Sequence, residues 1–178
     1  NGDHIAIVGC AEYATEVIVP ATIEELPVTV IAQNAFNGHM FLTSFTAPST
    51  LIHISKWAFR NCSQLQTVDL SGSAVTTIDA EAFQNCSMLT TVNVPSVFET
   101  IGEGAFQTCT SLTSINLSDS VLTTIGNNAF NGCSSLTSVA FPSTLTSWGM
   151  GAFSGCALSS VDISSTNVTE ITSGFGTS

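Results

Sequence analysis

The chain has 178 residues, only 8% of them charged, and its formal net charge is −11. Two Lys and Arg residues stand against thirteen Asp and Glu residues. Nucleic acids and anionic lipids both require clustered cations, so this balance argues against either as a partner. Hydrophobic residues make up 44% of the chain, which argues against disorder. No stretch reaches the roughly 20 apolar residues of a membrane-spanning helix, so we expect no membrane insertion in this segment.

Residues 1–30 differ from the remainder and are predicted to form a β-rich N-terminal cap. Two short β-rich runs, HIAIVG (4–9) and EVIVP (16–20), are separated by residues 10–15. This arrangement predicts a hairpin-like structure. The polar side chains of this segment suit the end of a stack, which must tolerate water.

From residue 31 onward the pair Ala-Phe recurs at a regular interval in six repeat units. The Phe residues lie 23 or 24 positions apart: Phe36, Phe59, Phe83, Phe106, Phe130 and Phe153. An apolar anchor precedes each Ala by four positions: Ile31, Ile54, Ile78, Ile101, Ile125 and Trp148. A period of this length predicts a solenoid, in which each coil covers the apolar faces of its neighbours. Residues 31–178 are therefore predicted to form about six coils, with an incomplete last coil at Ile171.

Each repeat unit divides into two predicted parts. The Ala-Phe pair is expected in a single helical turn, because the second residue after Phe is mostly Gly or Asn, which tolerate left-handed backbone at a helix end. The pattern Leu-x-x-Val-x-Leu predicts a short strand with alternate residues buried. Strands of successive coils run in the same direction and should form a parallel sheet. The predicted strands are 45–47, 68–70, 92–94, 115–117, 139–141 and 161–163.

Five of the six cysteines follow the Phe of their unit by three positions: Cys62, Cys86, Cys109, Cys133 and Cys156. One thiol per coil in a fixed register predicts small buried side chains stacked on one another. Disulfides between neighbouring coils are the alternative, because stacked positions satisfy the Cα spacing of a bridge. Cys10 lies outside the series, and His39 stands in place of Cys in the first unit.

The repeated pattern I-x-x-x-A-F-x-x-C-x-x-L-x-x-V-x-L resembles the BspA-type leucine-rich repeat of bacterial and protozoan surface proteins. The resemblance covers about residues 10–175, with Trp148 in an Ile position and one residue missing near Ala157 as departures. It implies an α/β repeat solenoid, a right-handed stack with a parallel sheet of short strands on its concave face and short helical turns on its convex face. The family further implies adhesion, through binding of host matrix proteins or other cells.

Outward-facing residues of the predicted strands form two rows of small polar side chains. The central members of these rows are Thr67, Asp69, Thr91, Asn93, Ser114 and Asn116. Solenoids bind partners on such extended faces, so we interpret the rows as a docking surface for an extended protein ligand. The alternative is a hydrated sheet face with no ligand.

A second candidate site is formed by Lys56, Trp57 and Arg60, which include both cations of the chain. Trp57 occupies a position that is polar or Gly in the other units, so the sequence predicts an exposed aromatic side chain. An exposed Trp beside two cations suits an acidic or carbohydrate-bearing partner. The alternative is a lone surface aromatic covered by the stems of its neighbours.

The sequence offers no catalytic constellation, and we predict neither enzymatic activity nor a cofactor. His39 and Cys62 could approach one another, but a structural zinc ion requires four ligands, so no metal site is predicted. The carboxylates are scattered, without an acid–base pair. We therefore predict a non-catalytic protein-binding or adhesion module, located extracellularly or on a cell surface. The alternatives are a structural protein that self-associates through an open C-terminal end at Ser178 and, less favoured, binding of ice or glycans by the hydroxyl rows.

Overall fold

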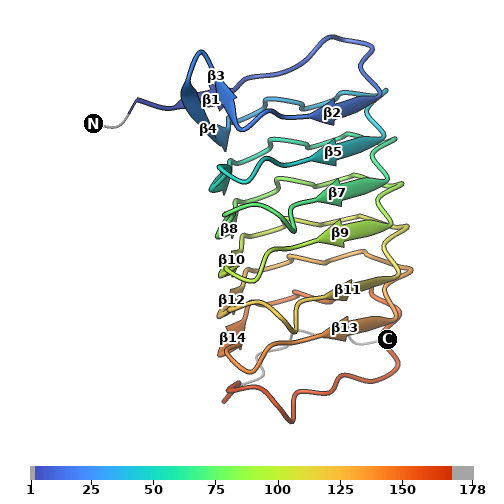
Figure 1. Cartoon of the computed structure of the whole chain (residues 1–178). Helices are drawn as coiled ribbons and strands as arrows, with labels where there is room; N and C mark the ends of the chain where they lie inside the picture. The colour runs from blue at the N-terminus through green and yellow to red at the C-terminus, as the bar shows by residue number, and fades with distance from the viewer. Residues whose placement is uncertain (1–2, 170–178) are drawn as a thin grey trace.

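The structure, a computed structural model, describes residues 3–169 as a stack of coils with two strands in most coils (Figure 1). The strands form two separate columns that run along the stack, and the N-terminal strands lie at one end of it. The anchor predicted at Ile171 and the open end predicted at Ser178 lie outside the described residues. Within those residues there is no helix long and apolar enough to span a membrane.

The larger sheet is formed by the apolar anchors and has eight strands. Seven of them pair in parallel in the order β1 (Ile5–Ile7), β4 (Leu26–Ile31), β6 (His53–Ile54), β8 (Thr77–Ile78), β10 (Thr100–Ile101), β12 (Thr124–Ile125) and β14 (Ser147–Trp148). Each anchor pairs with the anchor of the next coil, as Ile78 does with Ile101. The sequence pattern predicts no sheet at the anchors. This second parallel sheet is therefore a correction to the predicted architecture.

The other column contains the strands that the Leu-x-x-Val-x-Leu pattern predicts. Each begins one residue earlier than predicted, and the middle residue points into the core. The strands are β2 (Glu16–Ile18), β5 (Ser44–Thr46), β7 (Thr67–Asp69) and β9 (Thr91–Asn93) in one parallel sheet, and β11 (Ser114–Asn116) and β13 (Ser138–Ala140) in another. The strand predicted at 161–163 is wrong, because that segment pairs with no other strand.

The predicted hairpin between the two N-terminal runs is also wrong. β1 and β2 do not pair with each other, because β1 extends the larger sheet beside β4 and β2 extends the other sheet beside β5. The antiparallel hairpin is formed instead by β3 (Thr22–Ile23) and β4. The N-terminal segment therefore continues both sheets of the stack by one coil.

The Ala-Phe segments are turns, and residues 3–169 contain no helix, which corrects the predicted helical turns. The reason is that left-handed backbone occurs on both sides of the pair. In one unit Trp57 has φ 63° and Asn61 has φ 61°, and every unit repeats this pattern. Between two such residues a right-handed helix cannot propagate. The Gly or Asn after Phe indicates the second left-handed position, but the sequence pattern does not indicate the first.

Backbone hydrogen bonds in the turns alternate between the same coil and the next one. The N–H of Arg60 donates to Trp57 O within the turn. The N–H of Phe59 donates to Ala82 O, and that of Asn61 donates to Gln84 O, both in the following coil at 2.8 Å. The turns therefore satisfy their own polar groups and join the coils at the same time.

The Phe residues of the repeats form one continuous column in the core. The ring centroids of Phe59 and Phe83 are 4.9 Å apart, and those of Phe83 and Phe106 are 5.4 Å apart. The rings are nearly parallel, with interplanar angles of 15° or less from Phe36 through Phe153. All six are buried. The predicted column is confirmed.

The five cysteines of the series form a second column beside the rings. These five and Cys10 are free thiols, so the disulfide alternative is wrong. Each thiol of the series donates to a Phe carbonyl of the preceding coil, as Cys86 Sγ does to Phe59 O at 3.1 Å. Burial raises the pKa of Cys62 and of Cys133 to about 12. These thiols are therefore protonated donors in the core. Cys is preferred here because it combines a small apolar volume with a weak donor.

Removal of one central ring tests the column. Phe106→Ala is expected to lower the free energy of unfolding by about 3–5 kcal/mol, because it leaves a cavity between two stacked neighbours. Phe41→Ala serves as the control, since Phe41 is 45% exposed. Urea denaturation followed by circular dichroism measures both variants. An equal decrease in the free energy of unfolding in the two variants would contradict a stabilising role of the stacked rings.

Candidate functional site

The six residues of the predicted docking surface lie on three neighbouring strands. They occupy the first and third positions of β7, β9 and β11, on either side of a buried residue. Thr67 is aligned with Thr91 and Asp69 with Asn93 in the parallel register. All six are exposed except Asp69, which is half-buried. We call these residues the polar ladder.

The polar ladder is interrupted between β9 and β11, where no strand pairing is formed. A cavity of about 230 Å³ opens at this break. It is lined by Ser71, Val92, Asn93, Val94, Asn116, Asp119 and Ser120. The ladder residues Asn93 and Asn116 therefore face a recess that has polar walls and an apolar part. No feature of the sequence indicates this break, because the repeat remains in register there.

The side chains beside the break are fixed by local hydrogen bonds. Asn116 Oδ1 accepts the backbone N–H of Ser118 at 3.0 Å and its hydroxyl at 2.8 Å. Asp69 Oδ1 accepts the corresponding pair from Ser71, at 3.1 and 2.7 Å. The hydroxyl of Ser71, its N–H and the Asn93 side chain hold the pKa of the Asp69 carboxyl below its ordinary value, although burial opposes them. Local hydrogen bonds therefore fix two side chains of the ladder, one of which carries a negative charge.

These local bonds also explain an alternation along the chain. The second residue after the strand is Pro in one unit and Ser in the next. In the Ser units a buried hydroxyl closes the turn: Ser73 Oγ donates to Leu70 O and accepts from Val75 N. In the Pro units the N–H of Leu51 donates directly to Pro48 O. The Ser turn needs one more residue than the Pro turn, which gives the 23- and 24-residue spacings.

The second candidate site is less open than the sequence predicts. Trp57 is half-buried, which corrects its prediction as an exposed aromatic. Lys56 Nζ lies 4.3 Å from the ring centroid, and Arg60 Cζ lies 5.8 Å from it. Arg60 also approaches Glu81, with its Nη2 3.8 Å from a carboxylate oxygen. Both cations therefore lie over the ring, so the ring offers little free surface to a partner.

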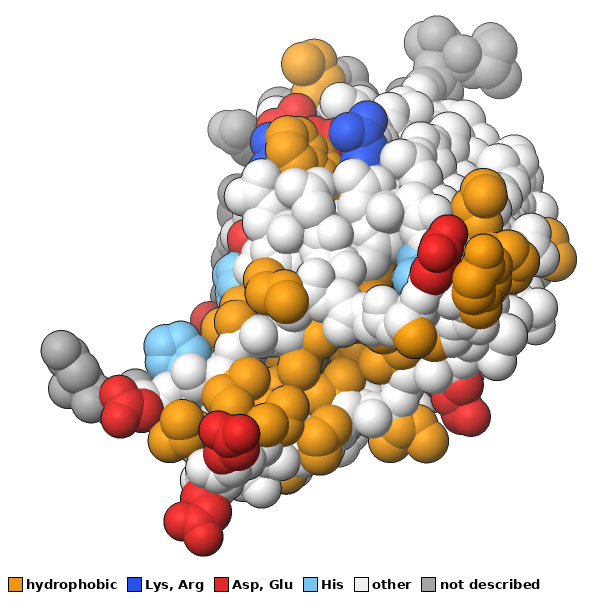
Figure 2. Space-filling view, turned by 90° about the horizontal axis from the view of Figure 1, so that it is seen from above, with side chains coloured by type: hydrophobic (Ala, Val, Ile, Leu, Met, Phe, Trp, Pro, Cys, Tyr) orange, Lys and Arg blue, Asp and Glu red, His pale blue; other side chains and the backbone are white. Residues whose placement is uncertain are grey.

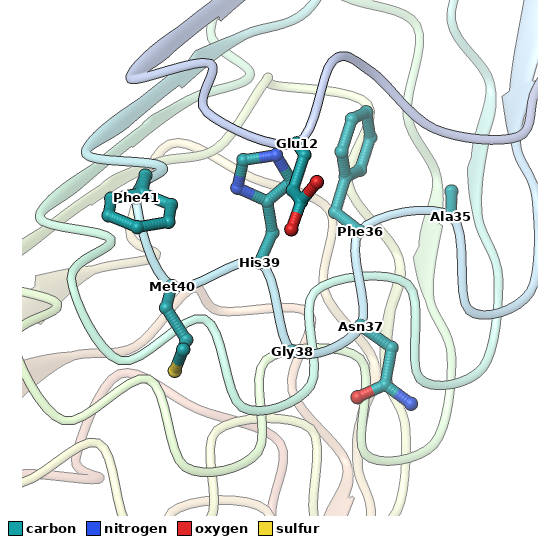
Figure 3. A pocket seen from close by; sticks show the side chains of 8 residues that line it. All are labelled: Glu12, Ala35, Phe36, Asn37, Gly38, His39, Met40 and Phe41. Carbon is teal, nitrogen blue, oxygen red and sulfur yellow. The ribbon is translucent and has the colours of Figure 1, made fainter.

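A second recess lies at the N-terminal end of the stack, and the sequence analysis did not anticipate it (Figure 3). Its volume is about 250 Å³, and it is lined by Glu12, Ala35, Phe36, Asn37, Gly38, His39, Met40 and Phe41. The only signal in the sequence is the replacement of Cys by His39 in the first unit.

His39 and Cys62 are engaged in separate structural hydrogen bonds. His39 Nε2 lies 2.8 Å from Ala11 O and 3.2 Å from Cys10 Sγ. Cys62 Sγ donates to Phe36 O at 2.9 Å. His39 thus bonds to the preceding coil, as the cysteines do in later units. No group of three or more His, Cys, Asp or Glu side chains in the described chain is arranged to hold a metal ion.

The family pattern described as "BspA type Leucine rich repeat region (6 copies)" matches residues 29–156 and 99–175, and so extends over most of the chain. The chain belongs to the BspA-type leucine-rich-repeat family. Its members are repeat proteins that are generally not catalytic. No curated protein matches the sequence.

Solved structures of bacterial repeat proteins share the fold. The T. pallidum leucine rich repeat protein is 26% identical, with a TM-score of 0.66 over 83% of this chain and 78% of that protein. A leucine rich cell surface protein from Faecalibacterium prausnitzii is 24% identical, with a TM-score of 0.72 over 92% of this chain. This chain spans 50% of the length of that cell surface protein. At that identity the likeness establishes the fold.

Ser71→Ala is expected to raise the pKa of the Asp69 carboxyl toward its ordinary value, because it removes the largest stabilising hydrogen bond. In the parent protein this carboxylate contributes stability above the pKa it has when unfolded, and the contribution is lost as pH falls through the lowered folded value. An NMR titration of the side-chain carboxyl carbons measures the shift. Ser118→Ala removes the matching hydroxyl from a non-titrating Asn and should leave the Asp69 titration unchanged. An Asp69 pKa that is the same in all three proteins would contradict this assignment.

Proposed function

We propose that this chain is a non-catalytic protein-binding module of a secreted or cell-surface protein, and that it binds an extended protein ligand along the polar ladder. The observation that carries this proposal is the recess between β9 and β11, where two ladder side chains and the ends of two strands face an open cavity of about 230 Å³. Solenoids present continuous surfaces of this kind to their partners.

Three physical features support the ladder as the binding surface. Its side chains are short, so a partner can approach the sheet closely and contact several coils. Local turns fix Asn116 and Asp69 before binding, which lowers the entropy cost of ordering them. Val92 and Val94 line the recess and offer an apolar contact within a polar surround, as binding sites commonly do.

The Lys56, Trp57 and Arg60 cluster has a weaker claim to ligand binding. The ring is already in contact with both cations, so a partner gains little additional apolar burial there. We assign this cluster to local packing between neighbouring coils. The proposed extracellular or surface location is supported by the similar Faecalibacterium prausnitzii protein, which is described as a cell surface protein.

Substitution of the ladder tests the proposal. Binding to immobilised fibronectin, laminin and collagen is measured by biolayer interferometry with the parent protein and with Asn93→Lys and Asn116→Lys. Each substitution places a long cation in the recess and is expected to weaken binding by about tenfold or more, since blocking a central contact of an interface costs over 1 kcal/mol.

Two matched variants separate this outcome from general effects of charge. Thr124→Lys adds the same cation to β12 of the larger sheet, where the side chain is exposed, and should leave binding unchanged. Trp57→Ala should also leave it unchanged. Binding that survives both Asn substitutions, or that falls equally with Thr124→Lys, would overturn the assignment to the polar ladder.

A further inference from the structure

The N-terminal recess arises because the first coil is shorter than the others. Between the two sheets a full coil has twelve residues, for example residues 32–43 between Ile31 and Ser44. The first coil has eight, residues 8–15, between Ile7 and Glu16. The missing four residues correspond to most of an Ala-Phe turn. The first turn of the stack, around Phe36, therefore has no equivalent turn above it.

This shortening leaves a row of backbone acceptors without donors. At each junction between full coils, three N–H groups of one turn donate to three carbonyl oxygens of the next. At the first junction the acceptors belong to Lys56, Ala58 and Arg60. The equivalent oxygens one repeat earlier belong to Gln33, Ala35 and Asn37. No hydrogen bond from residues 3–169 reaches these three oxygens.

Several hydrogen-bond acceptors lie at the recess. Ala35 and Asn37, whose carbonyl oxygens accept no hydrogen bond from residues 3–169, line it, and Glu12 contributes a carboxylate from the shorter first coil (Figure 3). His39 also lines the recess, where its Nε2 donates to Ala11 O and its Nδ1 is buried with no partner within the described chain. Acceptors that share one recess attract a group that only donates, and an ammonium or guanidinium group fulfils this requirement.

An apolar rim lies beside these acceptors. Met40 is 62% exposed, Phe41 is 45% exposed and Tyr13 is 70% exposed. The rings of Tyr13 and Phe41 are in contact, with centroids 5.2 Å apart. Figure 2, which views the stack from above, shows apolar side chains gathered on this face with acidic side chains around them. A clustered apolar surface with a polar border is typical of a protein-binding site.

Carboxylates predominate at this end of the stack. Five lie within the first 25 residues, while the two cations, Lys56 and Arg60, lie in the turn of the next coil and contact the Trp57 ring. The five are Asp3, Glu12, Glu16, Glu24 and Glu25. Such a surface accelerates the association of a cationic partner and repels another molecule with net charge −11, which disfavours a second copy of this chain.

We propose that the N-terminal end of the stack docks a basic peptide segment of a partner protein. A Lys or Arg side chain of the segment enters the recess, donates to the carbonyl oxygens of Ala35 and Asn37, and pairs with Glu12. The neighbouring apolar side chain of the segment packs on Tyr13, Met40 and Phe41. This site is separate from the polar ladder and does not depend on the function proposed for it.

The test uses two synthetic peptides and the ¹⁵N-labelled protein. The basic peptide is Ac-Lys-Phe-Lys-NH₂, and its acidic counterpart is Ac-Glu-Phe-Glu-NH₂. Titration followed by ¹H–¹⁵N NMR is expected to give saturable shifts for the backbone amides of residues 38–41 and of Glu12 with the basic peptide alone. Equal shifts with the acidic peptide, no saturable shift, or shifts confined to the polar ladder would overturn the proposal.

Two charge-reversal variants complete the experiment. Glu12→Lys is expected to weaken binding of the basic peptide by about fivefold or more, because it exchanges an attractive charge for a repulsive one. Glu99→Lys makes the same change at an exposed position far along the chain and should leave the affinity within about twofold, because distant surface charges are screened by salt. Equal affinity in both variants contradicts a role for Glu12. Shifts at residues 38–41 that grow with protein concentration, without any peptide, would show that a second copy occupies the site.

Discussion

The structure depends on peptide groups that point to the neighbouring coil from within the Ala-Phe turns. Left-handed residues on both sides of each pair turn alternate N–H groups toward the next coil, and the Phe ring between them lies directly over the next ring. Hydrogen bonding and apolar packing therefore both require the same spacing between equivalent residues of neighbouring coils. Because each coil meets only its neighbours, a change in one coil alters the structure locally, which permits a break at β9 and β11 within an otherwise regular stack.

The features that recur in every unit could be predicted from the sequence. The Phe column and the buried cysteines follow from an interval of 23 or 24 residues, and the alternation around Val68 and Val92 locates the strands to within one residue. The second sheet could not be predicted in this way, because strands of two residues such as Thr77–Ile78 are too short to display an alternation. The predicted helical turn was wrong because the residue before Ala-Phe is left-handed in every unit. Residue type does not indicate this conformation, since it occurs at residues as different as Trp57, Glu81 and Gly104.

In the candidate sites, too, features that recur in every coil could be predicted from the sequence, and features that occur only once could not. The polar ladder was predictable because every coil repeats its geometry. The recess beside Asn93 and Asn116 was not, since it results from a local loss of strand pairing with no change in spacing. The structure agrees with the alternative reading of Trp57, because Lys56 and Arg60 lie over the ring and reduce its exposure. The N-terminal recess results from a coil that departs from the repeat, so periodicity carries no information about it.

Native-state hydrogen exchange tests the central claim most directly. The amides of Phe59, Phe83 and Phe106 each donate to the next coil at 2.8 Å. If these bonds hold the stack together, the three amides exchange only through global unfolding, at rates that follow the free energy of unfolding. Exchange of these amides at the rate of surface loops, while the strand amides stay protected, would show that the sheets alone hold the coils together and would contradict the account.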